Sequence, residues 1–319
     1  MFLRDSGATL TTTTGSVLTI GAGQTVHGRG GITGAFVNEG TIRNDSTSLL
    51  TLTPQEAGIA NRGRIEVQGG GIVINNAALF DNGGDVVVND GRSLTANGGY
   101  NQSDGTTTVN GTLTVNAAPA VFQGGTLGGV GTVRGDVRST AAVVAPGNSV
   151  GTLTVVGDYE QQSGAVLRIE LRDPALGTPS SDHLTVSGAV ILGGTLDVVR
   201  LGGYTPPPGT SVEIISAASV TGRFDTVLGA GPLDVIYTAD RVLLYARCAA
   251  GDGDCNGTVD LVDHAAFADC MAGPGALPHP TRPGLTAEQC LAGFDLDGDG
   301  DVDLDDFAPF ARAFAVSNP

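Results

Sequence analysis

The chain lacks long apolar segments, and no run reaches the roughly 18 consecutive apolar residues that a transmembrane helix needs. Tryptophan is absent as well, and aromatic residues make up only 5% of the 319 residues. Glycine, in contrast, occurs 50 times and is accompanied by many Thr, Val and Asn residues. This composition is typical of short strands joined by tight turns. The bulk of the chain is therefore predicted to be all-β.

Basic side chains are scarce: 16 stand against 33 acidic ones, and every one of them is arginine. The imbalance is concentrated in residues 248–319, which hold 13 acidic residues and two arginines and have a net charge of −11. The first 247 residues have a net charge of only −6. An acidic segment of this density repels nucleic-acid phosphates and anionic membranes, and it needs bound cations if it is to fold. The charge pattern therefore argues against nucleic-acid binding.

Residues 1–246 contain a series of short β-runs separated by Gly and Asn. Clear examples are Gly71–Asn75, Asp85–Asn89 and Thr112–Asn116. The runs recur without the two-residue turns of hairpins, and stacked coils tolerate loops of unequal length. The pattern favours a parallel solenoid and leaves a sandwich or barrel as the alternative.

Residues 124–228 contain a characteristic succession of motifs. It includes Gly124–Val133, Val144–Val155, Ser181–Val186 and Gly222–Asp225, in that order. This succession resembles the C-terminal part of autotransporter passenger domains and the related autotransporter-associated β-strand repeats. The resemblance implies a right-handed parallel β-helix, which this stretch caps and helps to fold. The translocator domain that follows in that family is replaced here by the acidic segment, so self-transport is not implied.

Two segments of the acidic region match the 12-residue calcium loop of an EF-hand. Such a loop supplies oxygens from positions 1, 3 and 5, a backbone carbonyl at 7, position 9 and a carboxylate at 12, with Gly at position 6. The first loop fills positions 1, 3, 5, 6, 7, 9 and 12 with Asp252, Asp254, Asn256, Gly257, Thr258, Asp260 and Asp263. The second loop fills them with Asp295, Asp297, Asp299, Gly300, Asp301, Asp303 and Asp306. Two complete matches predict two Ca²⁺ ions.

An apolar pattern with helical spacing follows each loop. Its members are Leu261, Ala265, Phe267 and Ala268 after the first loop, and Leu304, Phe307, Phe310, Ala311 and Phe314 after the second. No comparable helix is expected before either loop, because Arg247–Gly251 and Leu291–Phe294 are short. Val259 and Val302, at position 8, are expected to form a short two-stranded contact between the paired loops.

This loop-then-helix plan, with Asp instead of Glu at position 12, resembles a type I dockerin over residues 247–319. The resemblance implies docking to a cohesin-like protein or another cell-surface component through positions 10 and 11. These positions hold Leu261, Val262, Leu304 and Asp305. The two halves differ there, and the pair of small hydroxyl residues often seen in the family is missing.

An extracellular or cell-surface location is expected, because calcium loops of this kind need more free calcium than the cytosol offers. Residues 1–18 contain one arginine and a threonine run, without the apolar core of a signal peptide. We therefore expect that the true start lies upstream or that the sequence is a fragment.

All four cysteines lie in the acidic region, where three connectivities are open to them. A bridge between Cys270 and Cys290 is favoured because it would clamp the long segment between the two loops. Cys248 and Cys255 could pair around the mouth of the first loop. Zinc is a poor alternative because the Cys and His spacings match no finger pattern.

Catalytic signatures are weak. Acidic residues in the β region lie singly at the edges of coils, at Asp81, Asp85, Asp90, Asp136 and Asp158. His27 and His183 belong to no recognisable nucleophile motif, and no Gly-x-Ser-x-Gly elbow occurs. We expect a noncatalytic β-helical protein with a calcium-binding docking module. The alternative is a dockerin-bearing polysaccharide lyase or glycoside hydrolase, which would need a cleft with at least two carboxylates and an Arg on one solenoid face.

Overall fold

The computed structural model describes residues 1–5, 7–13, 15–54, 59–75, 80–117, 119–178 and 180–317, with side chains up to residue 314. The chain divides into two compact units. The first comprises residues 1–204, 213–230 and 237–242, and the second comprises residues 205–212, 231–236 and 243 onward. The second unit thus also includes residues 205–212 and 231–236, which lie before the boundary at residues 246 and 247 that the sequence predicts.

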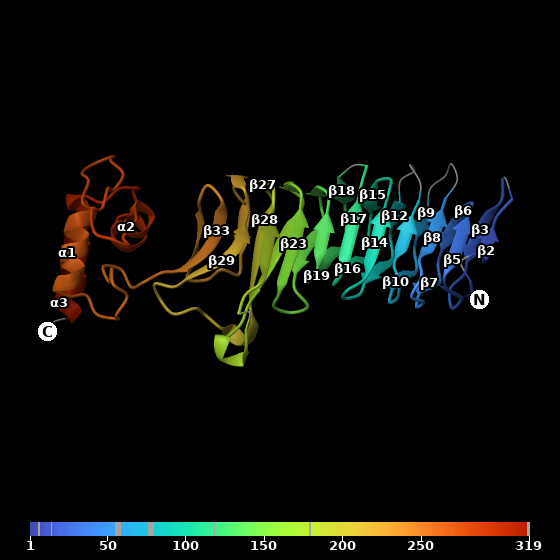
Figure 1. Cartoon of the computed structure of the whole chain (residues 1–319). Helices are drawn as coiled ribbons and strands as arrows, with labels where there is room; N and C mark the ends of the chain where they lie inside the picture. The colour runs from blue at the N-terminus through green and yellow to red at the C-terminus, as the bar shows by residue number, and fades with distance from the viewer. Residues whose placement is uncertain are drawn as a thin grey trace. The chain divides into compact units, whose positions relative to one another are not determined.

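The first unit is a parallel β-helix, which confirms the predicted fold class. Its strands form three long sheets, and along most of the unit each strand pairs in parallel with the third strand after it in the chain. Ile65, for example, lies beside Ile42 on one side and Val86 on the other. Figure 1 shows the strands stacked coil upon coil along this unit. One coil therefore contributes one strand to each sheet.

The first sheet has 11 strands. They are β1 (Phe2–Leu3), β4 (Thr25–Gly28), β7 (Thr41–Asn44), β10 (Arg64–Val67), β13 (Asp85–Val88), β16 (Thr106–Val109), β19 (Thr126–Gly129), β22 (Val143–Pro146), β25 (Val166–Leu171), β28 (Thr195–Arg200) and β31 (Thr226–Leu228).

The second sheet has 12 strands. They are β2 (Thr9–Thr11), β5 (Gly30–Thr33), β8 (Leu50–Thr53), β11 (Ile72–Ile74), β14 (Ser93–Ala96), β17 (Thr112–Val115), β20 (Thr132–Arg134), β23 (Thr152–Val156), β26 (His183–Val186), β29 (Ser211–Ser216), β33 (Arg241–Ala246) and β32 (Leu233–Tyr237).

The third sheet has 10 strands. They are β3 (Val17–Ile20), β6 (Ala35–Asn38), β9 (Ile59–Asn61), β12 (Phe80–Asn82), β15 (Tyr100–Gln102), β18 (Ala120–Phe122), β21 (Val137–Ser139), β24 (Tyr159–Gln161), β27 (Ala189–Leu192) and β30 (Ser219–Gly222). Two short 3-10 helices, Pro174–Leu176 and Leu201–Gly203, lie in loops between strands.

Alternation of inward and outward side chains builds the core of the β-helix. In β17, Leu113 and Val115 are buried, whereas Thr112 and Thr114 are turned toward solvent or the surface. Parallel sheets covered on both faces have continuous apolar strands, but each sheet here has one solvated face. Because every second side chain points to the solvated face, polar Thr alternates with apolar residues along the strands. This alternation makes the strands recognisable in the sequence.

A column of polar side chains runs through this core. Asn38, Asn61, Asn82 and Gln102 occupy equivalent places on successive coils, and each is fully buried. Asn38 Nδ2 donates to Asn61 Oδ1 at 2.7 Å, and Asn61 Nδ2 donates to Asn82 Oδ1 at 2.7 Å. Each Asn side-chain nitrogen of this ladder donates to the next coil, whereas Asn38 Oδ1, in the first member, is buried without a hydrogen-bond partner among the described residues.

Glycines form a second column at one corner of the coil. A Cβ on Gly63 would lie 2.2 Å from the carbonyl oxygen of Gly40, and one on Gly84 would lie 2.2 Å from that of Gly63. A Cβ on Gly105 would likewise lie 2.1 Å from the carbonyl oxygen of Gly84, and one on Gly125 would lie 2.0 Å from that of Gly105. Only a residue without a side chain allows successive corners to approach this closely.

The second unit contains three helices, α1 (Leu261–Cys270), α2 (Ala287–Phe294) and α3 (Leu304–Ser317). Phe267, Phe294 and Phe310, one from each helix, meet in its apolar core. Among the described residues, none of the helices combines the length and the apolar character that crossing a bilayer requires.

The helix α2 corrects the expectation that no helix precedes the second loop. It begins at Ala287, after the N-cap Thr286, whose side chain accepts from the backbone N–H of Gln289 while the Gln289 side chain accepts from the backbone N–H of Thr286. This reciprocal capping box stabilises a helix too short for its apolar pattern to stand out. The second loop is therefore preceded and followed by a helix.

The predicted apolar face of α1 is also wrong. Leu261, Ala265 and Ala268 are exposed, and the buried residues of this helix are Asp263, Ala266, Phe267 and Cys270. The core side of α1 is set by the carboxylate at position 12 of the loop and by the half-cystine at its end. The exposed leucine belongs to a separate surface, described below.

Candidate functional site

The first loop folds around the carboxylate of Asp263, which is fully buried. Its Oδ1 accepts from the backbone N–H groups of Gly253 at 2.7 Å and Asp254 at 3.1 Å, and its Oδ2 accepts from that of Asp260 at 2.8 Å. One carboxylate oxygen of Asp263 lies within 4.8 Å of one from Asp252 and one from Asp254. The structure thus brings predicted positions 1, 3 and 12 together.

The remaining positions of the first loop shape its turn. Asp252 Oδ2 accepts from the backbone N–H of Gly257 at 2.9 Å, and Asn256 Oδ1 accepts from the backbone N–H of Thr258 at 2.8 Å. Gly257 has φ of 90°, a backbone conformation that favours glycine. Asp260, at position 9, caps the N-terminus of α1 by accepting from the N–H of Val262. The same chain segment therefore ends the loop and starts the helix.

The second loop repeats this arrangement around Asp306, which is also fully buried. Its Oδ1 accepts from the N–H groups of Leu296 at 2.5 Å and Asp297 at 3.1 Å, and its Oδ2 accepts from that of Asp303 at 2.8 Å. Carboxylate oxygens within 4.8 Å of one another form two groups that share Asp306, namely Asp295, Asp297 and Asp306, and Asp301, Asp303 and Asp306.

The turn of the second loop also matches the first. Asp295 Oδ1 accepts from the N–H of Asp299 at 3.1 Å, and its Oδ2 accepts from that of Gly300 at 3.0 Å. Gly300 has φ of 94°, close to the value at the equivalent glycine of the first loop. Carboxylate-rich loops of this form supply the hard oxygen ligands that Ca²⁺ prefers. The carboxylates at predicted positions 1, 3 and 12 of each loop therefore lie close enough together to hold a divalent cation.

Burial and neighbouring carboxylates raise the pKa of two carboxyls in the loops. The pKa of Asp252 is raised from its ordinary value by burial and by the neighbouring carboxylates of Asp263 and Asp254, against hydrogen bonds that lower it. The pKa of Asp297 is raised by desolvation and by the carboxylates around it. A divalent cation between these groups would remove the repulsion and favour their ionised forms.

Position 8 behaves differently from the prediction. Val259 and Val302 are both buried in the same apolar core, but neither belongs to a strand. The carbonyl of Val302 accepts instead from the N–H of Ala272 at 3.0 Å. Val259 and Val302 thus belong to one apolar core. Ala272, in the segment between the loops, binds the Val302 carbonyl that a strand pair would use.

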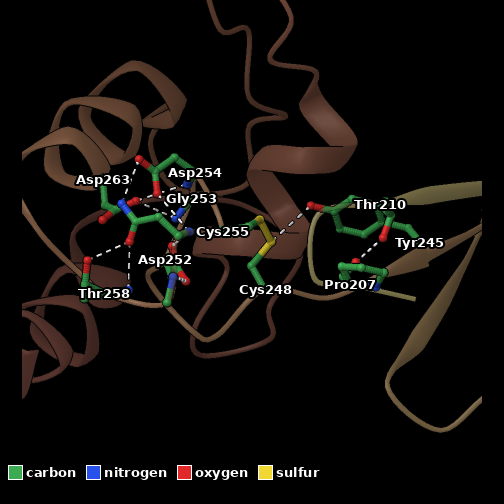
Figure 2. The surroundings of a disulfide bond; sticks show 12 residues. Pro207, Thr210, Tyr245, Cys248, Asp252, Gly253, Asp254, Cys255, Thr258 and Asp263 are labelled. Carbon is green, nitrogen blue, oxygen red and sulfur yellow. Dashed lines mark hydrogen bonds between the residues drawn. A yellow bond between two sulfur atoms is a disulfide. The ribbon is translucent and has the colours of Figure 1, made fainter. Parts of the chain in front are cut away.

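The two cysteine pairs favoured by the sequence are the two disulfides of the structure. Cys270, the last residue of α1, is joined to Cys290 in α2, and both are fully buried. Cys248 is joined to Cys255 beside the first loop, and Figure 2 shows the bond between the loop and Tyr245. The Cys248–Cys255 bridge joins the residues before the first loop to the loop itself, and the Cys270–Cys290 bridge joins α1 to the helix that precedes the second loop.

An exposed apolar groove lies between α1 and α3. Leu261 and Leu304, at position 10 of the two loops, are 74% and 72% exposed, and Val262 at position 11 is half exposed. The groove has a volume of about 240 Å³. Its lining is Leu261, His264, Phe307, Phe310, Ala311 and Phe314. Three of the residues predicted for partner binding are therefore apolar and exposed, and the fourth, Asp305, is exposed beside Leu304.

A second hollow, of about 160 Å³, lies on the third sheet of the β-helix. Asp136, Arg138, Asp158 and Glu160 all line it. Asp136 Oδ1 accepts from the N–H of Asp158 at 2.9 Å, and Arg138 Nε donates to Glu160 Oε2 at 2.7 Å. The sequence predicts Asp136 and Asp158 to be isolated turn residues and does not point to Arg138 or Glu160, because their proximity depends on the register between coils.

Each of the two histidines of the β-helix lies next to a carboxylate. His27 Nδ1 is 2.9 Å from Asp45 Oδ2. His183 lies between Thr185 and Glu213, with its Nδ1 3.1 Å from the Thr185 hydroxyl and its Nε2 3.3 Å from Glu213 Oε1. Burial lowers the pKa of His183.

Comparison with known proteins gives no relative. No family model matches the chain, and no curated protein matches it. The loops, the groove and the hollow are therefore the features that bear on function.

Proposed function

We propose that the protein is a noncatalytic β-helical scaffold of the cell surface or extracellular space, carrying a dockerin-like module at residues 247–319 that binds two Ca²⁺ ions and docks to a protein. The observation that carries this proposal is the repeated geometry of the two loops. In each, a fully buried carboxylate at position 12 accepts three backbone N–H groups and lies within 4.8 Å of two other carboxylates.

Calcium would supply charge neutralisation and stiffness to this module. Residues 248–319 have a net charge of −11, and their apolar core is small. Small metal-binding units gain much of their folding free energy from the ion, because the site does not exist in the unfolded chain. The ligands at positions 9 and 12 belong to the first turns of α1 and α3, so cation binding would fix the start of both helices.

The groove between α1 and α3 supports the docking part of the proposal. Leu261, at position 10 of the first loop, lines this apolar groove, and Leu304 at the equivalent position of the second loop is exposed as well. The surrounding module is strongly acidic. We therefore expect a cohesin-like partner that inserts an apolar side chain into the groove and surrounds it with Arg or Lys.

The disulfides support the proposed location. Cys248–Cys255 and Cys270–Cys290 account for all four cysteines. Structural disulfides persist in oxidising compartments, which include the extracellular space.

Calorimetric titration of Ca²⁺ into the chelator-treated full chain tests the calcium part. We expect two bound ions per chain and a gain of helical circular dichroism that chelator reverses. Absence of binding together with an unchanged spectrum would overturn the proposal.

The docking part is tested by titrating a panel of purified cohesin domains into the calcium-loaded chain. Binding is expected to be lost in the double variant Leu261→Asp and Leu304→Asp, while Ca²⁺ stoichiometry stays at two. If no cohesin binds the unaltered chain, the docking part fails and the calcium part stands by its own titration.

The hollow on the third sheet gives a specific reason to consider a second function, a polysaccharide lyase or glycoside hydrolase. It combines several carboxylates with an Arg on one face of the solenoid. Hydrogen bonds from Gln162 and Arg138 lower the pKa of Glu160, however, which keeps this carboxyl ionised and unsuited to act as a general acid. Asp136 and Asp158 also hold the coils together by accepting backbone N–H groups.

An assay of the full chain against a panel of plant and microbial polysaccharides separates the two functions. We expect no cleavage. Turnover that disappears in Arg138→Ala and Glu160→Gln, but not in the surface control Arg168→Ala, would establish the enzyme.

A further inference from the structure

The two calcium-type loops differ in charge at positions 5 and 7, although the backbone contacts of the position-12 carboxylate correspond. In the first loop position 7 is Thr258, which is exposed and whose hydroxyl donates to Asn256 Oδ1 within the loop. In the second it is Asp301, which is only 4% exposed. A calcium loop coordinates the ion through the backbone carbonyl at position 7, so the EF-hand pattern assigns no role to the side chain of Asp301.

The two oxygens of the Asp301 carboxylate differ in their hydrogen bonding. Its Oδ2 accepts a short hydrogen bond of 2.5 Å from the N–H of Gly275, and its Oδ1 is buried without a hydrogen-bond partner among the described residues. One of its oxygens lies within 4.8 Å of oxygens from Asp303 and Asp306, which are buried too. A buried carboxylate that has one oxygen without a donor and lies beside two more carboxylates is strongly unfavourable unless a cation lies beside it.

The same carboxylate is tied to the segment between the loops. This segment, residues 271–289, is held at its ends by the Cys270–Cys290 disulfide. Asp269 accepts from the N–H and hydroxyl of Thr281 farther along. Near its start, Ala272 donates to the Val302 carbonyl and Gly275 donates to Asp301. Both of these contacts end on consecutive residues of the second loop.

We propose that Asp301 adds its side-chain carboxylate to the ligands of the cation in the second loop, and that its bond to Gly275 makes residues 271–276 fold together with that ion. The inference rests on the proposed calcium binding. Oδ1 faces the cation while Oδ2 keeps the hydrogen bond to Gly275. The second loop, which then has six carboxylate ligands against four in the first, fills first, and its filling orders the start of the connecting segment.

Amide hydrogen exchange of the full chain, recorded through a Ca²⁺ titration, tests this order. Protection of the Gly275 and Ala272 amides is expected to rise with that of Gly300 in the second loop, at lower calcium than protection of Gly257 in the first. Simultaneous protection of both loops, or a Gly275 amide equally protected in chelator, would overturn the inference.

Two substitutions sharpen the test. Asp301→Asn is expected to weaken the tighter site about 10- to 100-fold and to remove the calcium dependence of Gly275 exchange. Asp301→Thr gives the second loop the residue that the first loop has at position 7, and it is expected to reduce the difference between the two affinities to what Asp299 against Asn256 leaves. Asp305→Asn is the matched control, because it removes one negative charge from an exposed neighbour outside the cluster.

The outcomes separate this inference from the proposed function. If the unaltered chain binds no Ca²⁺, the proposed function fails and the inference fails with it. If the chain binds two ions and Asp301→Asn and Asp301→Thr both behave like Asp305→Asn, the extra ligand is wrong and the calcium module stands.

Discussion

Asn61 donates a hydrogen bond of 2.7 Å to Asn82 on the next coil, inside a core that excludes water from both side chains. Asn61 also accepts at 2.7 Å from Asn38 on the coil before it. A buried amide in this position specifies which residue of one coil lies beside which residue of the next. An apolar core of similar volume would tolerate a slipped register more readily.

Replacing Asn61 by Ala is expected to destabilise the β-helix by about 3 kcal/mol, because it leaves the Asn38 amide without its buried acceptor and also opens a cavity. Urea unfolding followed by circular dichroism measures the change. Asn97 provides the control, since it makes the same kind of inter-coil hydrogen bond at the surface. Asn97→Ala is expected to cost about 0.5 kcal/mol or less. Equal losses in the two variants would contradict the role of burial.

The carboxyl of Asp182 is expected to make the β-helix less stable as the pH rises. Asp182 is 1% exposed, and burial raises its pKa to about 7 despite hydrogen bonds from the N–H groups of Glu170 and Gly151. The unfolded value is near 4, so the folded state holds the extra proton between these two values. Stability is then lost between about pH 4 and pH 7 and is level above that range.

Asp182→Asn removes this titration, so its melting temperature should change less than that of the unaltered chain between pH 5 and pH 8. Both proteins are measured at saturating calcium, which keeps the acidic loops from contributing. A pH dependence that is identical in the two proteins would show that Asp182 titrates elsewhere.

Loss of the Cys270–Cys290 bridge is expected to destabilise the helical unit and leave the β-helix unchanged. The bridge closes a segment with a sequence separation of 20, for which chain entropy gives about 3 kcal/mol. The double variant Cys270→Ser and Cys290→Ser should therefore lose helix at lower temperature, at equal calcium concentration. Scanning calorimetry shows whether the β-helix transition stays in place, and a shift of that transition would contradict the prediction.

Asp263→Ala is expected to reduce the calcium stoichiometry from two to one and to weaken α1. Its carboxylate accepts backbone N–H groups from the loop and belongs to the capping box of the helix. Removal leaves these donors unsatisfied, at about 1–3 kcal/mol. Asp306→Ala removes the other site and serves as the partner variant. Calorimetry that still finds two ions in either variant would refute the assignment of position 12.

The predictable parts of this protein are local in sequence. Glycine at position 6 and carboxylates at positions 1, 3 and 12 lie within one short loop, so their spacing alone places Asp252 and Asp263 together. The apolar and polar alternation of the strands is equally local. The helix α2 also has a local signal, the capping-box pair Thr286 and Gln289, although the four residues Leu291–Phe294 show no helical pattern by themselves.

The remaining features depend on how coils and helices stack. Asn61 and Asn82 look like turn residues in the sequence, and only the register between coils makes them a buried ladder. Asp136 and Asp158 meet for the same reason. Leu261 is apolar at helical spacing and still lies outside the core, because Asp263 turns the opposite side of α1 inward.

The glycine corner suggests how chains of this kind change length. The corner of each coil, from Gly40 through Gly63 to Gly84, rests on the backbone carbonyl of the coil before it and depends on no particular side chain. A duplicated or deleted coil would therefore meet the same surface on both sides. Gene segments encoding whole coils could be gained or lost without redesign of the neighbours, whereas a change of a few residues within a strand would disturb every stacked column at once.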